Sequence, residues 1–149
     1  MENQMFCYQC QETAGGKGCT AGGMCGKKPA TAHLQDVLIY VTKGLAELAT
    51  ACRREGHAVS SDVTHMLEDN LFVTITNANF DDDFITARIE DTEKAKEALR
   101  QLLPKDFFHS EAALPLDMTS TGVNPHIGVL SEKDENKRSL LELITYGLK

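Results

Sequence analysis

The sequence predicts an all-α fold: a three-helix bundle with an N-terminal loop rich in glycine and cysteine, followed by the opening helix of a second bundle. Two observations predict this arrangement. Between residues 34 and 102, and again near the end of the chain, apolar residues recur at steps of three and four, the period of a helix that is buried on one face. The first 28 residues lack this period, and they hold four of the five cysteines and six of the eleven glycines.

We therefore divide the chain into four segments. They are residues 1–32 for the loop, 33–104 for the three-helix bundle, 105–132 for a connecting segment and 133–149 for the start of a further helix. Glycine permits positive φ and close backbone approach, which a loop wrapped around a compact object requires. A flexible tail is the alternative that composition leaves open, and the interleaved cysteines favour the ordered loop.

The first helix of the bundle has clear start and stop signals. Pro29 and Thr31 are typical of a helix N-terminus, and Gly56 of the end of one. Its apolar face consists of Leu34, Val37, Leu38, Val41, Leu45, Leu48, Ala49 and Cys52. Because Cys52 continues this face, we interpret it as a small buried hydrophobic residue and not as a metal ligand.

The second helix is expected to begin at Ser60 or Ser61 and to run to about Asn79. Its apolar side consists of Val63, Met66, Leu67 and Leu71. The β-branched residues at 73–76 leave a short strand open as an alternative for that stretch.

The third helix is expected to follow the acidic residues 81–83 and to stop before Pro104, with an interruption near Asp91 and Thr92. Its apolar residues are Phe84, Ile85, Ile89, Ala95, Ala98, Leu99 and Leu102. Three adjacent carboxylates could hold a divalent cation, but the alternate spacing and the central glycine of a calcium loop are missing. An acidic first turn, which the helix dipole favours, is the better interpretation.

Residues 105–124 lack periodicity and include Pro115, so we interpret them as a connection laid over the bundle. Residues 136–149 are predicted to be helical again. Their apolar side consists of Leu140, Leu141, Ile144 and Leu148. If this side stays exposed, it offers a surface for oligomerisation.

Composition and charge exclude several classes of function. The net charge of -7 and the pI near 5.2 argue against nucleic acid as a main partner, because phosphate binding needs clustered Lys and Arg. No stretch approaches the roughly 18 consecutive apolar residues of a membrane span, and the N-terminus lacks the basic and apolar regions of a signal peptide. The sequence thus predicts a cytoplasmic protein with no membrane partner.

The cysteines Cys7, Cys10, Cys19 and Cys25 are separated by two, eight and five residues. Disulfides are disfavoured in the cytoplasm, so such a group points to a metal or a catalytic site. Thiolates select zinc and iron–sulfur clusters, and four of them suffice for either. Zinc sites usually combine two short Cys-x2-Cys pairs, whereas only one is present, so the spacing favours an iron–sulfur cluster and leaves structural zinc open.

The five histidines give no sign of a site. They are His33, His57, His65, His109 and His126. None forms a pair at three or four residues' spacing, so surface or helix-end positions are expected, and no catalytic residue is assigned.

Several stretches resemble the N-terminal part of the hybrid cluster proteins, also called hydroxylamine reductases or prismane proteins. The most specific are Met5-Phe6-Cys7-Tyr8-Gln9-Cys10-Gln11-Glu12-Thr13, Gly18-Cys19-Thr20 and Gly23-Met24-Cys25-Gly26-Lys27. Supporting stretches are His33-Leu34-Gln35-Asp36, Thr74-Ile75-Thr76-Asn77-Ala78-Asn79-Phe80 and Arg138-Ser139-Leu140-Leu141-Glu142-Leu143. The resemblance covers essentially the whole chain.

This resemblance implies that Cys7, Cys10, Cys19 and Cys25 bind one [4Fe-4S] cluster, because in the family this spacing accompanies the cubane form. The cluster in the family passes electrons to a mixed iron–sulfur–oxygen site that reduces hydroxylamine to ammonia, and nitric oxide reduction is also assigned to such proteins. Family members are far longer than this chain, and the His, Glu and Cys ligands of the hybrid site lie in their later regions.

The resemblance therefore implies an oxidoreductase portion through which electrons enter, without the catalytic site itself. The expected partners are a redox donor protein, favoured if it is basic, and the remainder of the enzyme. The alternatives are a stand-alone electron carrier or binding module, and structural zinc in the same loop. Another alternative is an oligomer that forms through the last helix.

Overall fold

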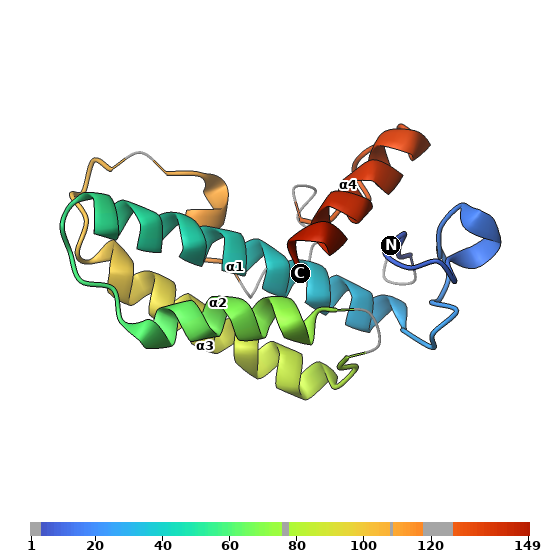
Figure 1. The fold of residues 1–149 in the computed structure, drawn as a ribbon, viewed down its shortest axis with the longest axis horizontal. Helices are drawn as coiled ribbons and strands as arrows, with labels where there is room; N and C mark the ends of the chain where they lie inside the picture. Colours follow the sequence, from blue (N-terminus) through green and yellow to red (C-terminus); the bar gives the residue numbers. More distant parts are fainter. Residues whose placement is uncertain (1–3, 76–77, 108, 118–126) are drawn as a thin grey trace.

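The computed structural model describes residues 4–75, 78–107, 109–117 and 127–149. Within these ranges the fold is helical and contains no β-strand, which confirms the predicted all-α class. The elements are η1 (Ala14–Gly16), α1 (Pro29–Arg54), α2 (Ser61–Val73), α3 (Asp82–Arg100), η2 (Glu111–Ala113) and α4 (Glu135–Leu148). Helix α1 runs along the molecule with α2 and α3 beside it, and the N-terminal loop lies past its first turn (Figure 1).

The ends of α1 agree with the signals in its sequence. Pro29 occupies the first turn, where its missing N–H costs no hydrogen bond. At the other end Gly56 adopts a φ of 82°, its N–H donates to Arg53 O, and the N–H of His57 donates to Cys52 O. This is a Schellman motif, which satisfies the last carbonyls. Because α1 begins at Pro29, its first turn falls inside the 1–32 segment, and the division into domains stays a prediction.

Helix α2 is shorter than predicted. Ser60 caps it, its hydroxyl oxygen accepting from Asp62 N at 3.2 Å, but the helix ends at Val73 and not near Asn79. Thr74 is the C-cap, and Ile75 N donates to Phe72 O at 3.1 Å in a final turn. The alternative of a strand at 73–76 is not adopted in its described part, and position 76 lies outside the described residues.

Helix α3 begins as predicted but is not interrupted. The Asp81 carboxylate accepts from Phe84 N at 3.0 Å and caps the N-terminus, so the acidic run is a helix start. The predicted break near Asp91 and Thr92 is wrong, because the helix continues to Arg100. Thr92 is fully buried, and its hydroxyl donates to Arg88 O at 2.7 Å within the helix.

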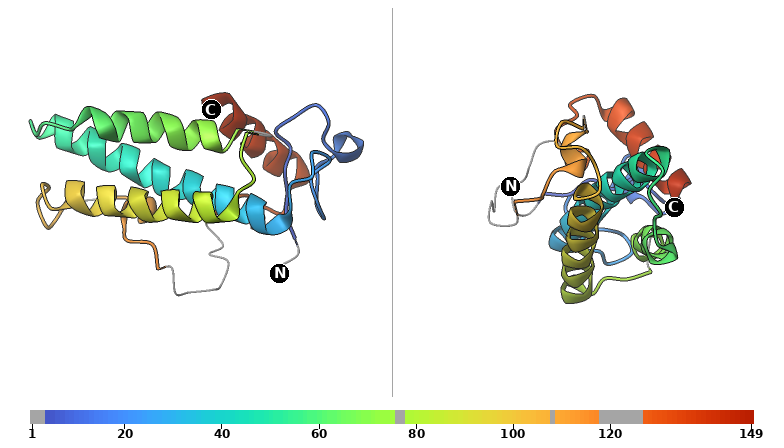
Figure 2. Two further views of the ribbon diagram at one scale, coloured as in Figure 1. Left: turned by 90° about the horizontal axis from the view of Figure 1, so that it is seen from below. Right: turned by 90° about the vertical axis from the view of Figure 1, so that its left-hand side faces the viewer.

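The bundle core consists of two apolar clusters with a polar layer between the helices. The first cluster includes Leu45, Leu48, Ala49, Cys52, Leu99 and Leu103, and the second includes Val37, Leu38, Val41, Ile85 and Ile89. In the polar layer, the buried Asn70 side chain donates to Thr42 Oγ1 at 3.0 Å and to Thr92 Oγ1 at 2.8 Å. Figure 2 shows α2 and α3 lying along α1, and its second view looks along the bundle.

The connecting segment lies directly on α1 at η2. A Cβ placed on Gly44 would come within 1.8 Å of Ala112 O, so only glycine permits this approach. Lys96 of α3 reaches the end of η2 and donates to Leu114 O at 2.8 Å. This agrees with a connection laid over the bundle, although residues 118–126 lie outside the described part of the chain.

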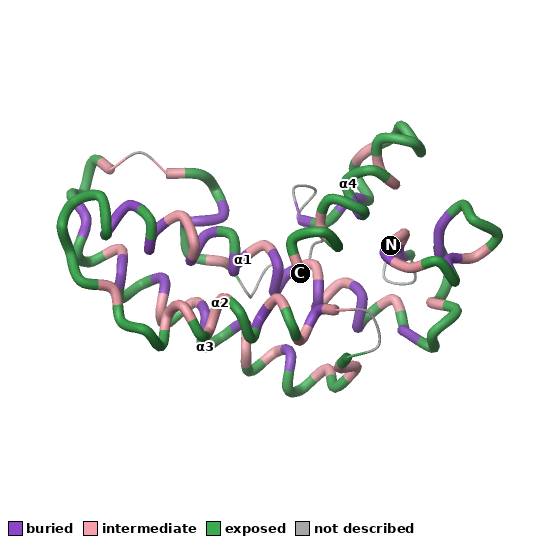
Figure 3. The backbone as a smooth tube through the Cα atoms, in the orientation of Figure 1, coloured by how far each residue is buried: buried purple, intermediate pink, exposed green. Residues whose placement is uncertain are grey.

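Helix α4 contacts the rest of the protein through its polar side and not through its apolar side. The Asp134 carboxylate caps it by accepting from Lys137 N at 3.1 Å. Its single buried residue is Glu142, whereas Leu140, Ile144 and Leu148 are 59%, 60% and 66% exposed. The exposed outer side of α4 is visible in Figure 3. No described helix has both the length and the apolar character that a membrane crossing requires.

Candidate metal centre in the N-terminal loop

The loop brings Cys7 and Cys19 together through its main chain. Cys7 N donates to Cys19 O at 3.1 Å and Cys19 N donates to Cys7 O at 3.0 Å, which forms an isolated antiparallel bridge. Met5 and Ala32 join the two cysteines in a small buried cluster that rests on the first turn of α1. Gly18, with a φ of 122°, permits the bridge, because a Cβ there would lie 2.4 Å from the Phe6 ring.

Hydrogen-bond donors surround the Cys19 sulfur. Ala14 N donates to Cys19 Sγ at 3.4 Å, and the Thr13 hydroxyl lies 3.9 Å from the same atom while donating to Cys7 O at 2.9 Å. Burial raises the pKa of the Cys19 thiol, but hydrogen bonds from the Ala14 and Met24 main chain and from Thr13 outweigh it, so the pKa is lowered. Such donors stabilise the thiolate, the form that binds metals.

Cys7 lies in a different environment. Burial raises the pKa of its thiol, and the nearby negative charge of Glu142 acts in the same direction. The positive charge of Lys27 and a backbone hydrogen bond from Gln9 oppose that rise without cancelling it. Lys27 is only 4% exposed, so its ammonium group is a fixed charge beside the loop.

Cys10 and Cys25 lie further out. Cys10 is half-buried and Cys25 is exposed. Around Cys25 the chain turns tightly, with Gly23 N donating to Lys27 O at 2.8 Å and Gly26 N donating to Gly23 O at 2.9 Å. A Cβ on Gly23 would lie 2.9 Å from Cys25 Sγ, so glycine leaves room for this sulfur.

The structure thus joins two of the four predicted ligands directly. Cys7 and Cys19 are paired, whereas Cys10 and Cys25 flank them on the same loop. Among the described residues no group of three or more His, Cys, Asp or Glu side chains is arranged to hold a metal ion. All five cysteines are free thiols, so the soft donor set that a zinc ion or an iron–sulfur cluster requires is available.

Several residues next to the loop were not predicted from sequence. Glu142 of α4 accepts from Tyr8 N and from the Gln9 side chain, and Arg138 stacks over the Phe6 ring at 4.2 Å. Nothing in the sequence pattern pairs residues 133 or 134 positions apart. Lys27 follows Cys25 closely in the sequence, but only its burial in the structure indicates that its charge lies beside the loop.

The remaining candidates are structural. Cys52 is fully buried and its thiol donates to Leu99 O at 3.4 Å, which confirms that it is a core residue. His57 and His65 are exposed, His33 and His109 are half-buried, and His126 lies outside the described residues. Burial lowers the pKa of His33.

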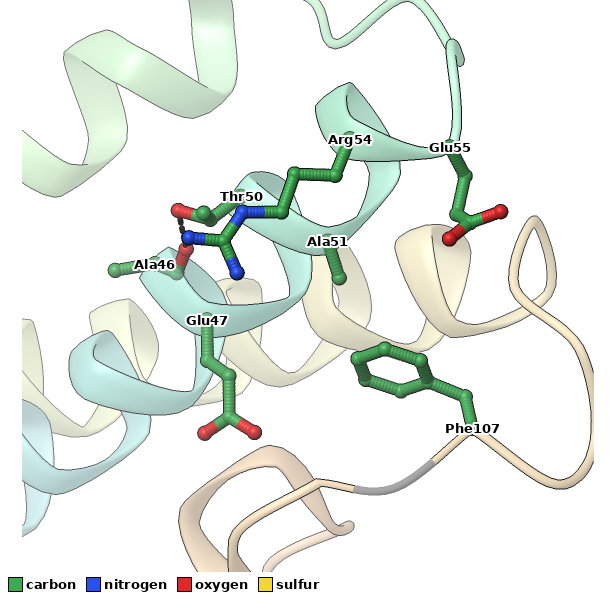
Figure 4. A pocket seen from close by; sticks show the side chains of 7 residues that line it. All are labelled: Ala46, Glu47, Thr50, Ala51, Arg54, Glu55 and Phe107. Atoms are coloured by element: carbon green, nitrogen blue, oxygen red, sulfur yellow. Dashed lines mark hydrogen bonds between the residues drawn. The ribbon is translucent and has the colours of Figure 1, made fainter.

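A groove of about 610 Å³ lies at the far end of α1 from the cysteines. Figure 4 shows the Arg54 and Glu47 side chains on α1 and the Phe107 ring facing them. Glu47 is already engaged by Ser110, whose N–H donates to it at 2.8 Å. No cysteine or histidine lines this groove, so we take the cysteine loop as the candidate site.

Comparison with known proteins shows which family the chain belongs to. The model of the Prismane/CO dehydrogenase family matches residues 5–149. The hydroxylamine reductase of Desulfovibrio desulfuricans is 50% identical over 155 aligned positions, which cover 100% of this chain and 28% of that protein. The hydroxylamine reductase of Clostridium perfringens is 47% identical, with 97% of this chain and 28% of that protein covered.

A third relative, the hydroxylamine reductase of Acetivibrio thermocellus, is 41% identical over 97% of this chain and 27% of its own length. The chain therefore spans little more than a quarter of the length of the curated relatives that it matches. The resemblance seen in the cysteine spacing and in the flanking stretches is confirmed by a match over nearly the whole chain. The chain belongs to the Prismane/CO dehydrogenase family.

Proposed function

We propose that this chain is the portion of a hydroxylamine reductase through which electrons enter, and that Cys7, Cys10, Cys19 and Cys25 hold one [4Fe-4S] cluster. The observation that carries the proposal is the ordering of the cysteine loop. Its backbone pairs Cys7 with Cys19 and directs an N–H donor at the Cys19 sulfur. Hydrogen bonds to ligand sulfurs are among the features that tune iron–sulfur potentials.

In this proposal, the loop binds the cluster with an exposed side and a buried side. Cys25 is exposed, and the neighbouring Met24 is 68% exposed, so electrons arrive on that side. Cys7 and Cys19 anchor the cluster on the protein side. With a net charge of -7, the chain favours a basic donor protein, since opposite charge speeds association. A reducing compartment, the cytoplasm, keeps the five thiols reduced.

Reduction of hydroxylamine is assigned here to the longer protein and not to this chain alone. The hydroxylamine reductases that it matches are more than three times as long. At about 100° per residue, Leu140, Ile144 and Leu148 lie on the side of α4 opposite to Glu142. We assign this exposed apolar side to packing against the polypeptide that follows the matched region in those relatives.

Metal analysis of the purified chain tests the cluster. The expected result is a brown protein with about four iron and four sulfide per chain, whose colour is bleached by dithionite and whose reduced form gives an EPR signal. A colourless protein with one zinc per chain would refute the cluster and support structural zinc in the same loop.

Sedimentation velocity tests the assignment of the α4 surface. We expect the remaining part of the Desulfovibrio desulfuricans protein, added in trans, to bind this chain, and Ile144→Lys to abolish binding. Leu102→Lys changes an apolar side chain that is 44% exposed elsewhere on the bundle and serves as the control. A stable dimer of this chain alone, broken by Ile144→Lys, would instead show that a second copy covers α4 and would favour a stand-alone carrier.

A further inference from the structure

The polar side of α4 contacts the turn between Cys7 and Cys10. Tyr8 N donates to Glu142 Oε2 at 3.2 Å, and the Gln9 side chain donates to the same oxygen at 3.1 Å. Lys149 Nζ in turn donates to Gln9 Oε1 at 2.7 Å. Both ends of the Gln9 amide are therefore held by α4 and its C-cap residue, and Gln9 is only 5% exposed.

The positions on α4 suit this contact. Glu142 lies within α4, and Lys149 is the residue that caps its C-terminus. Arg138, one turn before Glu142, stacks over the Phe6 ring at 4.2 Å. Two charged side chains of α4 and that of its C-cap residue Lys149 thus contact the residues around the Cys7-x-x-Cys10 turn. Lys149 also donates to Thr74 O at the end of α2.

Water cannot readily replace these hydrogen bonds, because Glu142 is only 2% exposed. A buried carboxylate is stable only when donors and opposite charges replace the water it has lost. Tyr8 N and the Gln9 amide supply the donors. Removing the carboxylate would leave the Tyr8 N–H and one end of the Gln9 amide without these partners, and the turn would lose two of its hydrogen bonds to α4.

We propose that Glu142 is a positioning residue for the cysteine loop: it fixes the Cys7-x-x-Cys10 turn, with Lys149 as a second anchor through Gln9, and its negative charge lowers the reduction potential of the cluster held there. The part on the potential rests on the proposed function. The part on the turn does not, because it concerns the thiols of the metal-free chain.

The effect on potential follows from charge. Reduction of a cluster adds an electron, and a buried negative charge nearby makes that addition less favourable. Glu142 and Lys27 are both buried, and their opposite charges act on the pKa of Cys7 in opposite directions. Neutralising Glu142 should therefore raise the potential, and neutralising Lys27 should lower it.

Alkylation of the metal-free chain tests the positioning part. Iodoacetamide is added to the reduced chain, and modification of each cysteine is followed by mass spectrometry. We expect Glu142→Ala to speed modification of Cys7 and Cys10 by about tenfold or more, because the hydrogen bonds to a charged group are lost. Buried Cys52 is the internal standard, and Glu135→Ala, at an exposed glutamate of the same helix, is the matched control.

A conservative variant separates positioning from charge. Glu142→Gln keeps an oxygen that can accept from Tyr8 N, so it should restore most of the protection of Cys7 in the alkylation experiment. It lacks the negative charge, so the midpoint potential of the loaded chain should shift in the positive direction. Glu135→Gln should leave the potential unchanged, since the removed charge is exposed and screened by solvent.

The outcomes distinguish the two proposals. Unchanged alkylation of Cys7 and Cys10 in Glu142→Ala would overturn the positioning role. An unchanged potential in a fully loaded Glu142→Gln chain would overturn the role of the charge. A wild-type chain that binds no iron would refute the proposed function and with it the part on potential, whereas the alkylation rates would still decide the positioning part.

Discussion

Cys7 and Cys19 exchange both of their backbone hydrogen bonds, so the main chain fixes their relative positions on the loop. Their side chains differ, because the Cys19 thiol accepts from Ala14 N whereas the pKa of the Cys7 thiol is raised by burial. The bridge uses main-chain atoms alone and involves neither sulfur. It also allows ligand loss to be separated from loop unfolding in a variant.

Replacing Cys19 with serine should remove most of the bound iron, because a hydroxyl is a poor substitute for a soft thiolate ligand. The backbone bridge to Cys7 does not depend on the sulfur and should persist. The measurement is iron content per chain together with the visible spectrum after reconstitution of both proteins under the same conditions.

The matched control is Cys52→Ala. It removes a buried thiol from the bundle core and should cost about 1 kcal/mol of unfolding free energy, or somewhat more, while iron content stays at the wild-type level. Equal iron loss in the two variants would refute the assignment of the four loop cysteines as ligands.

Much of the bundle could be predicted because its apolar residues recur with the regular period of a helix. Pro29 and Gly56 mark the ends of α1, and Asp81 caps α3, since these residues act through local geometry that the sequence displays directly. The break predicted near Thr92 failed for a physical reason. Thr92 is a buried polar residue, but its hydroxyl donates to Arg88 O and accepts from the Asn70 side chain, so the helix continues through it.

The sequence displays the cysteines of the candidate site but not the residues that surround them. Cysteine spacing is local, whereas the contact of Glu142 with Tyr8 joins the two ends of the chain. Periodicity identifies which side of α4 is apolar, but it does not reveal what that side faces. The structure points the polar side toward the loop and leaves Leu140 and Ile144 exposed.

Gly44 should not tolerate a side chain. A Cβ at this position would lie 1.8 Å from Ala112 O. The main chains of α1 and η2 would have to move apart to make room for it. We expect Gly44→Ala to destabilise the chain by about 1–3 kcal/mol, measured by urea unfolding. Gly147→Ala is the control, because nothing lies within 4 Å of the added Cβ, and alanine should stabilise α4 by up to about 1 kcal/mol.

Lys96 and Lys94 provide a matched comparison on α3. Both form ion pairs three residues apart in sequence, Lys96 with Glu93 at 2.6 Å and Lys94 with Asp91 at 2.8 Å. The Lys96 side chain is fully buried and also donates to Leu114 O, whereas Lys94 is exposed.

Lys96→Ala should destabilise the chain by about 3–5 kcal/mol, because Glu93 and the Leu114 carbonyl would lose a buried partner. Lys94→Ala should leave the urea midpoint essentially unchanged, as is usual for exposed pairs. Similar urea midpoints for the two variants would contradict the view that the hydrogen bond from Lys96 to Leu114 O attaches the connecting segment to α3.

Asp36 makes stability depend on pH. Its carboxyl group is packed against Gly128, where a Cβ would lie 2.5 Å from Oδ2. Burial, followed by repulsion from Glu142, raises its pKa from 3.8 to about 7, against the opposing charges of Lys27, Lys149 and Lys43. The folded state binds this proton more tightly than the unfolded state does. The stabilisation that the protonated Asp36 carboxyl group contributes is therefore fully present below about pH 4 and is lost as the pH rises through 7.

The unfolding free energy of the wild-type chain should therefore fall between about pH 4 and pH 7 relative to that of Asp36→Asn, which cannot ionise. The rise in pKa sets an upper bound of about 4 kcal/mol on this difference. Urea unfolding of both proteins at pH 5 and pH 8 measures it, with Asp106→Asn, at an exposed carboxylate, as the control. Parallel pH profiles for the wild-type chain and Asp36→Asn would contradict a raised pKa of the Asp36 carboxyl group.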